Sequence, residues 1–258
     1  MLPRSKTRRA QWLLPTLAIG GILVAWEMMV RLTGAGNGPP APSAVLRSIL
    51  LHPGFLGWHT ALTVFEAVMG LAIAVAGAFL VSSAFARSPL AHTAFMPLVL
   101  AAQTIPMLAI APLLAQAIGE GMFANIAVTA YLCWFPSVIA FTHGFLTIDP
   151  DRLALFEVHG ASPRQTWRRL RLPNSAPSMV AGIRTSAGLA VISAIVSEYG
   201  TLVGGIGATI VKHIRQIAVL PADQLYALVV VAAVVGLIFT EAVHRLARYM
   251  LRGWLGEE

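Results

Sequence analysis

Four glutamates that lie within or beside apolar stretches are the first candidates for chemistry in this sequence: Glu27, Glu66, Glu198 and Glu241. A charged group near the centre of a bilayer costs about 2.5 to 3.5 kcal/mol, so it usually faces a helix-bundle interior or water. Glu198 precedes the glycine-rich stretch GTLVGGIG, which is typical of an irregular re-entrant segment or a gate. Two interpretations of Glu198 stay open: contact with a ligand, or pairing with an interior polar group.

Catalysis within a membrane would need further groups beside these glutamates, such as a metal-binding histidine pair or a serine at a nucleophile turn. The sequence contains no H-E-x-x-H and no G-x-S-x-G motif. His143 and His159 have no second ligand four residues on. Neither lysine, Lys6 or Lys212, follows a glycine as the lysine of a P-loop does. We therefore expect no enzymatic activity and no ATP hydrolysis by this chain.

The composition indicates a membrane protein, because 57% of the 258 residues are hydrophobic and 11% are charged. The formal net charge is +7, but the basic residues lie between apolar runs rather than on a soluble face beside stacking aromatics. This pattern argues against nucleic acid as a partner and favours a lipid bilayer. Cys133 is the only cysteine, so no intramolecular disulfide can form, and we expect a buried, inert thiol.

Apolar runs long enough to cross a bilayer divide the chain into membrane spans. They cover about residues 12–32, 61–86, 94–118, 122–146, 178–196 and 225–240. The sequence therefore predicts an all-α membrane protein with six transmembrane helices in a single domain, residues 1–258. Pro97, Pro106 and Pro112 predict kinks in the third span.

Small residues recur at helical spacing in the second span, at Gly70, Ala74 and Ala78. Such positions let helices approach closely in lipid, so we expect a helix–helix interface there.

The orientation follows from the basic residues on alternate sides of the spans. With a cytoplasmic N-terminus, most basic residues fall on the cytoplasmic side, beginning with the basic head at residues 1–11. The opposite side holds Arg31, Arg47, Lys212 and Arg215. An even number of spans then places both termini in the cytoplasm.

The segment of about residues 148–177, between spans four and five, is predicted to be organised rather than loose. Asp149 followed by Pro150 predicts a helix N-terminus, and that helix should stop at Gly160. Ser162, with Gln165 three residues later, predicts a capping box for a second helix.

Two features complete the expectation for this segment. Leu172 followed by Pro173 should end the second helix. The first helix offers an apolar face around Leu155 and Phe156. From the residues alone, this face lies either on span ends and lipid headgroups or on a cytoplasmic partner.

The spacing of Gly160 and the sequence Leu170-Arg171-Leu172-Pro173, nine residues later, resembles a signature of ABC-transporter importer permeases. That pattern is a Glu-Ala-Ala triplet, three residues, Gly, nine residues and Ile-x-Leu-Pro. The other matching stretches are Trp26-Glu27, Pro42-Ser43, Ile105-Pro106, Ala111-Pro112-Leu113, Gly182-Ile183-Arg184, Glu198 and Gly205-Ile206-Gly207. Together they resemble the branch that imports sulfonates, taurine, nitrate and related compounds.

The resemblance implies a homodimeric permease of the bacterial cytoplasmic membrane, with a small polar or anionic solute delivered by an extracytoplasmic binding protein. Vitamin or pyrimidine precursors belong to the same range of solutes. ATP and Mg²⁺ would bind to a partner ATP-binding subunit, and no cofactor to this chain. That subunit would dock on a coupling helix, which in this sequence comprises Ala154, Leu155, Phe156, Glu157, Gly160, Ala161 and Ser162.

One departure concerns the triplet, where Ala154 stands in place of the acidic residue of the family and Glu157 comes three positions later. We therefore expect docking mainly through shape and apolar burial. The residues proposed for the translocation path are Gln103, Thr104, Asn125 and Glu198. The alternative interpretation is a passive channel or a membrane scaffold without an ATPase.

Overall fold

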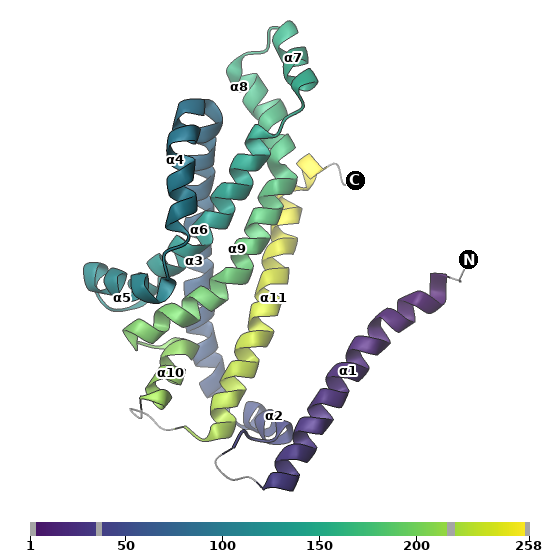
Figure 1. Ribbon diagram of the computed structural model, residues 1–258, viewed down its shortest axis with the longest axis vertical. Coiled ribbons are helices and arrows are strands. Elements are labelled where there is room, and N and C mark those ends of the chain that lie inside the picture. The colour runs from purple at the N-terminus through teal and green to yellow at the C-terminus, as the bar shows by residue number, and fades with distance from the viewer. Residues whose placement is uncertain (1–3, 35–37, 216–219, 256–258) are drawn as a thin grey trace. The chain divides into compact units, whose positions relative to one another are not determined.

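The computed structural model describes residues 4–34, 38–215 and 220–255. The regular elements in these ranges are all helices, and the ranges contain no strand (Figure 1). A lipid environment favours this class, because backbone N–H and C=O groups must find partners within their own segment where water does not reach them. The predicted all-α class is confirmed.

Five helices in the described ranges are long and apolar enough to cross a membrane. They are the Thr16–Thr33 part of α1 (Arg4–Thr33), α3 (Pro53–Arg87), α6 (Met122–Leu146), the helix Pro163–Thr201 that ends with α9 (Leu172–Thr201), and α11 (Ala222–Leu255). The shorter elements are α2 (Pro42–Leu51), α4 (Pro89–Ala102), α5 (Met107–Ile118), α7 (Pro150–Val158), α8 (Pro163–Thr166), the π-helical turn η1 (Trp167–Arg171) and α10 (Gly205–Ile214).

The third apolar run forms two short helices, α4 and α5, instead of one kinked span. The chain breaks before Pro106, whose ring disfavours a helical conformation of Ile105 and which has no N–H to continue the ladder. Pro97 and Pro112 lie inside α4 and α5. Of the three predicted kinks, the one at Pro106 is a break, so the third predicted span is not one continuous helix.

The chain forms two compact units, and the first comprises Met1–Gly57 and Val219–Val231. In this unit α1 contacts α2. The Glu27 carboxylate accepts hydrogen bonds from the Ser43 amide at 3.0 Å and the Ser43 hydroxyl at 2.8 Å, and it pairs with Arg31 at 2.7 Å. The predicted basic head, residues 1–11, lies outside the residues whose side chains are described. The single-domain organisation stays a prediction.

The second unit comprises Trp58–Ala218 and Ala232–Glu258. Within it, the small residues of α3 face α6. A Cβ added to Gly70 would lie 2.6 Å from the Cβ of Thr129, and Ala74 and Ala78 are buried. The close helix approach predicted from this spacing is therefore confirmed.

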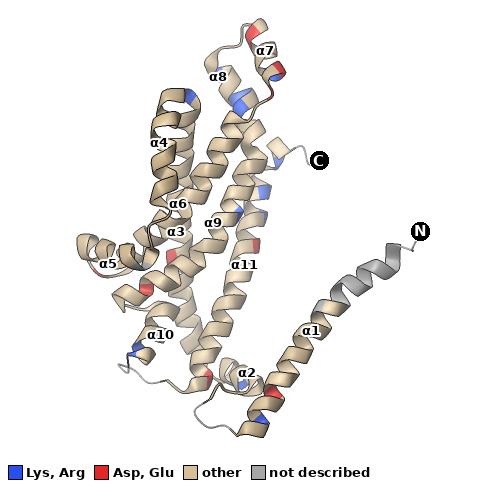
Figure 2. Ribbon diagram, viewed as in Figure 1, with Lys and Arg blue, Asp and Glu red and all other residues tan. Residues whose placement is uncertain are grey.

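The core of the second unit consists of apolar side chains from α3, α4, α6, α9 and α11. Cys133 is fully buried in it, and its thiol donates to the Ser186 carbonyl at 3.3 Å. At one end of this unit lie α7 and α8, α10 lies toward the other end, and α5 lies at the side, next to the end of α4 (Figure 1). Figure 2 shows Lys and Arg at the end that carries α7 and α8.

Candidate functional site

The segment between α6 and α9 is built as the sequence predicts at its first helix, α7. The Asp149 carboxylate accepts the Asp151 N–H at 3.0 Å and caps the N-terminus of α7. At the other end Gly160 has a φ of +64°, a conformation that favours glycine. Its N–H bonds to the Glu157 carbonyl at 2.9 Å, and the Ala161 N–H bonds to the Phe156 carbonyl at 3.0 Å. This pair of bonds is a Schellman motif, so Gly160 ends the helix.

The second helix begins with the predicted capping box. The Ser162 N–H donates to the Gln165 side chain at 2.7 Å, and the Gln165 N–H donates to the Ser162 hydroxyl at 3.4 Å. The predicted end at Leu172 and Pro173 is wrong, because the helix continues through η1 into α9. In η1 the Leu172 N–H bonds to the carbonyl of Trp167, five residues back. This wider turn lets the helix continue past Pro173, which has no N–H to donate.

The loop leaves the apolar side chains of α7 uncovered. None of the residues of α7 is buried, and Leu155 and Val158 are 56% and 84% exposed. The predicted docking residues Ala154, Glu157 and Ser162 are also exposed. Phe156, Gly160 and Ala161 line a cavity of about 370 Å³ with His159, Gln165 and Arg169.

Buried polar residues form a second cluster at the other end of the same unit. Glu198 is fully buried, and its carboxylate accepts hydrogen bonds from the Thr63 hydroxyl at 2.7 Å and the Gly207 N–H at 2.5 Å. The Thr63 hydroxyl in turn accepts the Ile206 N–H at 3.0 Å. Glu198 thus holds the first turn of α10 against α9. Thr63 connects α3 to both of these helices.

A neighbouring branch of this cluster contains Glu66 of α3, which is 3% exposed. Asn125 donates to the Glu66 carboxylate at 2.9 Å and accepts from the Thr201 hydroxyl at 3.0 Å. Glu66 lies one turn after Thr63 on α3, and Thr201 lies three residues after Glu198 at the end of α9, so the two branches share these two helices. Side chains of α3, α6 and α9 and backbone N–H groups of α10 therefore meet at this end of the unit.

The glycines after Glu198 are required by this packing. A Cβ on Gly205 would overlap the Glu198 carboxylate, and one on Gly207 would overlap the Ile195 carbonyl. Gly205 also has a φ of +92°. The glycine-rich stretch is therefore a close approach between α9 and α10, built around one buried carboxylate.

The four residues predicted for a translocation path are not brought together. Asn125 and Glu198 belong to the buried network, which favours the interpretation of Glu198 as pairing with interior polar groups. Gln103 and Thr104 are exposed at the break between α4 and α5, where the Thr104 hydroxyl donates to the Ala101 carbonyl at 2.7 Å. Whether any of the four lines a path stays a prediction.

Sequence reasoning missed the partners of Glu198. Thr63 lies 135 residues away in the chain and Gly207 nine, and both are needed to satisfy the carboxylate. The signal available in the sequence was Glu66, an acidic residue in the middle of an apolar run, one turn after Thr63.

Comparison with known proteins places these features in a family. Residues 70–252, well over half of the chain, match the model of the binding-protein-dependent transport system inner membrane component. The formylaminopyrimidine transport permease protein ThiX of Halalkalibacterium halodurans is 33% identical over 74% of this chain and 77% of its own length.

Two further relatives carry other names. The putative aliphatic sulfonates transport permease protein SsuC of Bacillus subtilis is 23% identical over 95% of this chain and 89% of its own length. The nitrate import permease protein NrtB of a Synechocystis species is 26% identical over 75% of this chain and 73% of its own length. This chain therefore belongs to the family of inner-membrane components of binding-protein-dependent transport systems, which are transporters rather than enzymes.

Proposed function

We propose that the chain is the translocation subunit of an ATP-driven importer. A homodimer forms the path, and one ATP-binding subunit docks on α7 of each copy. A soluble binding protein delivers the solute from outside. ATP and Mg²⁺ belong to the partner subunit. Closure and opening of the ATPase pair then switch the path between outward and inward states.

The observation that carries this proposal is the uncovered apolar side of α7. A helix of nine residues is marginal in water by itself, yet α7 has a capping aspartate and a Schellman motif that hold it in place. Leu155 and Val158 remain exposed on it, beyond the ends of the membrane-spanning helices. An ordered helix with exposed apolar side chains outside the lipid supports a protein partner.

The contact with the ATPase is apolar in character. Ala154 replaces the acidic residue of the family signature, so an ion pair from that position is absent. Leu155 and Val158 supply area for burial, at about 25 cal/mol per Å² removed from water.

The membrane topology has six inserted segments. The helix α4 has 14 residues and is about 21 Å long, short of the roughly 30 Å hydrocarbon core. Together with α5 it makes the third segment. Both termini are cytoplasmic, and the basic residues at the α7 end support that side as the cytoplasm of a bacterial cell.

The solute is a small polar or anionic molecule. The names of the relatives support this range, since they refer to formylaminopyrimidine, aliphatic sulfonates and nitrate. Asn125 in the first turn of α6, Glu198 in the last turn of α9, and Gln103 and Thr104 at the α4–α5 break are the residues proposed to line the path.

Co-purification of the tagged full chain from its native host in mild detergent tests this function. We expect an ATP-binding subunit at about one per permease, and we expect Val158→Asp to remove it. Val203→Asp is the matched control, since Val203 is 61% exposed after α9, at the other end of the unit. Recovery of the chain alone, even after crosslinking, would favour a passive channel instead.

A further inference from the structure

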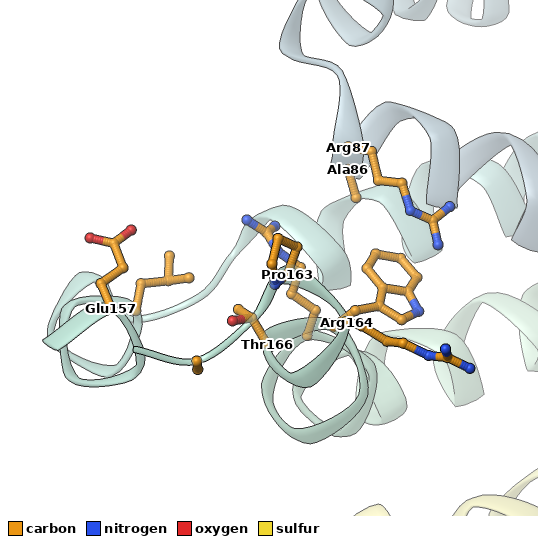
Figure 3. Close-up of a pocket in the computed structure, with 10 residues that line it drawn as sticks. Ala86, Arg87, Glu157, Pro163, Arg164 and Thr166 are labelled. Atoms are coloured by element: carbon orange, nitrogen blue, oxygen red, sulfur yellow. The ribbon is translucent and has the colours of Figure 1, made fainter. Parts of the chain in front are cut away.

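A second, larger cavity of about 830 Å³ lies on another side of the loop. The end of α3 forms one part of it with Arg87, α7 contributes Glu157, and the segment after Ser162 contributes Arg164, Trp167 and Arg171 (Figure 3). It lies beside Arg87, the last residue of α3, so under the topology proposed above it is at the cytoplasmic membrane surface.

The cavity carries positive charge that this chain does not neutralise. The ion pairs among the described residues, Glu27 with Arg31 and Glu241 with Arg245, involve none of its arginines. Glu157 is its one acidic residue, and Figure 3 shows Glu157 at the opposite end of the cavity from Arg87. Three guanidinium groups around one cavity repel one another unless an anion lies between them.

Two of the three arginines, Arg87 and Arg171, are held in place by neutral groups. Arg171 donates to the Phe145 carbonyl at 3.0 Å, and the Arg87 guanidinium lies 4.5 Å from the centre of the Trp167 ring. Trp167 packs in turn on Phe145, with ring centres 4.9 Å apart. Ordered arginines beside a tryptophan, at the level where a span ends, suit the headgroup region of a bilayer.

We propose that this cavity binds the phosphate of an anionic phospholipid headgroup. Arginine is well matched to phosphate because its planar fork of N–H donors contacts two phosphate oxygens together. Basic pockets at the cytoplasmic ends of membrane helices recognise such headgroups. The loop then has two sides with different partners: the apolar side of α7 for the ATPase, and the basic cavity for lipid.

Native mass spectrometry of the purified full chain, titrated with phosphatidylglycerol and with phosphatidylcholine, tests this assignment. We expect tighter binding of phosphatidylglycerol and a loss of about fivefold per arginine removed, so about 25-fold for R87Q/R164Q. The matched control is R152Q/R168Q, which removes two exposed arginines of the same loop that do not line the cavity. It should change the affinity much less, because these two arginines do not line the cavity that holds the headgroup.

The R87Q/R164Q variant keeps Arg171 and its bond to Phe145, and its elution in gel filtration should match that of the wild type. R87K/R164K keeps both charges and is expected to retain most of the lipid binding. An equal loss in the two glutamine variants would overturn the proposal, because the attraction would then be diffuse.

Two other results would overturn it as well. If inorganic phosphate binds to the chain and phosphatidylglycerol does not, the cavity is a site for a free anion. Absence of lipid binding, with loss of ATPase co-purification in R87Q/R164Q, would assign the cavity to a carboxylate of the protein partner. The lipid titration contains no ATPase, so its failure is distinct from a failure of the proposed function.

Discussion

Replacement of Thr63 by valine tests whether the buried network holds α10 in place. The Thr63 hydroxyl donates to Glu198 at 2.7 Å and accepts the Ile206 N–H at 3.0 Å, so valine, which has nearly the same shape, removes two bonds between helices. Such bonds contribute about 0.6 kcal/mol on average, and at most about 1.7 kcal/mol, in membrane proteins. We expect Thr63→Val to lower the free energy of unfolding by about 1 to 3 kcal/mol.

Thr129 offers a matched control for this substitution. It is also fully buried, but its hydroxyl has no hydrogen-bond partner among the described residues. Removing an unpaired buried hydroxyl relieves a desolvation cost, so Thr129→Val should leave the stability unchanged or raise it. The assay is unfolding of the purified chain by SDS in mixed micelles, followed by circular dichroism. Unfolding free energies of the two variants within about 0.5 kcal/mol of each other would refute the role given to Thr63.

Four further predictions concern single positions. Gly160→Val should abolish transport and ATPase co-purification while membrane insertion persists, because φ of +64° strains a β-branched residue; full uptake by the variant would contradict this. Ser162→Ala should destabilise the start of α8 by about 1 kcal/mol, seen as faster hydrogen exchange at Gln165, whose N–H loses the hydroxyl and keeps only the carbonyl of residue 162 as acceptor. Gly207→Ala should release the first turn of α10, with amide exchange at Ile206 as the readout, since a Cβ there overlaps the Ile195 carbonyl; unchanged protection would contradict the packing. Cys133, fully buried, should react with maleimide only after denaturation, and prompt labelling of the native chain would disprove its burial.

Local signals in the sequence predicted much of the fold. The caps at Asp149, Gly160 and Ser162 act over three or four residues, so their residue types suffice to place the ends of α7 and the start of α8. The spacing of Gly70, Ala74 and Ala78 indicated a helix interface in the same way, although it did not identify α6 as the partner.

The sequence was a poorer guide where one signal permits two backbone solutions. Pro106 and Pro173 both suggested a disturbed helix. Pro106 accompanies a break between two helices, whereas Pro173 follows a π-helical turn in a continuous helix. The difference depends on how neighbouring hydrogen bonds rearrange, which residue types do not reveal. The partners of Glu198 were hidden for a related reason, since Thr63 meets it only after α3 has packed beside α9.

The continuity from Pro163 to Thr201 has a mechanical consequence. A helix of 39 residues is about 58 Å long and resists bending, so it acts as one arm between the loop at its start and the buried carboxylate network near its end. A tilt of about five degrees about the first end displaces the other end by about 5 Å. The displacement is larger than any hydrogen bond around Glu198, so a small rotation of the loop is enough to separate α9 from α10.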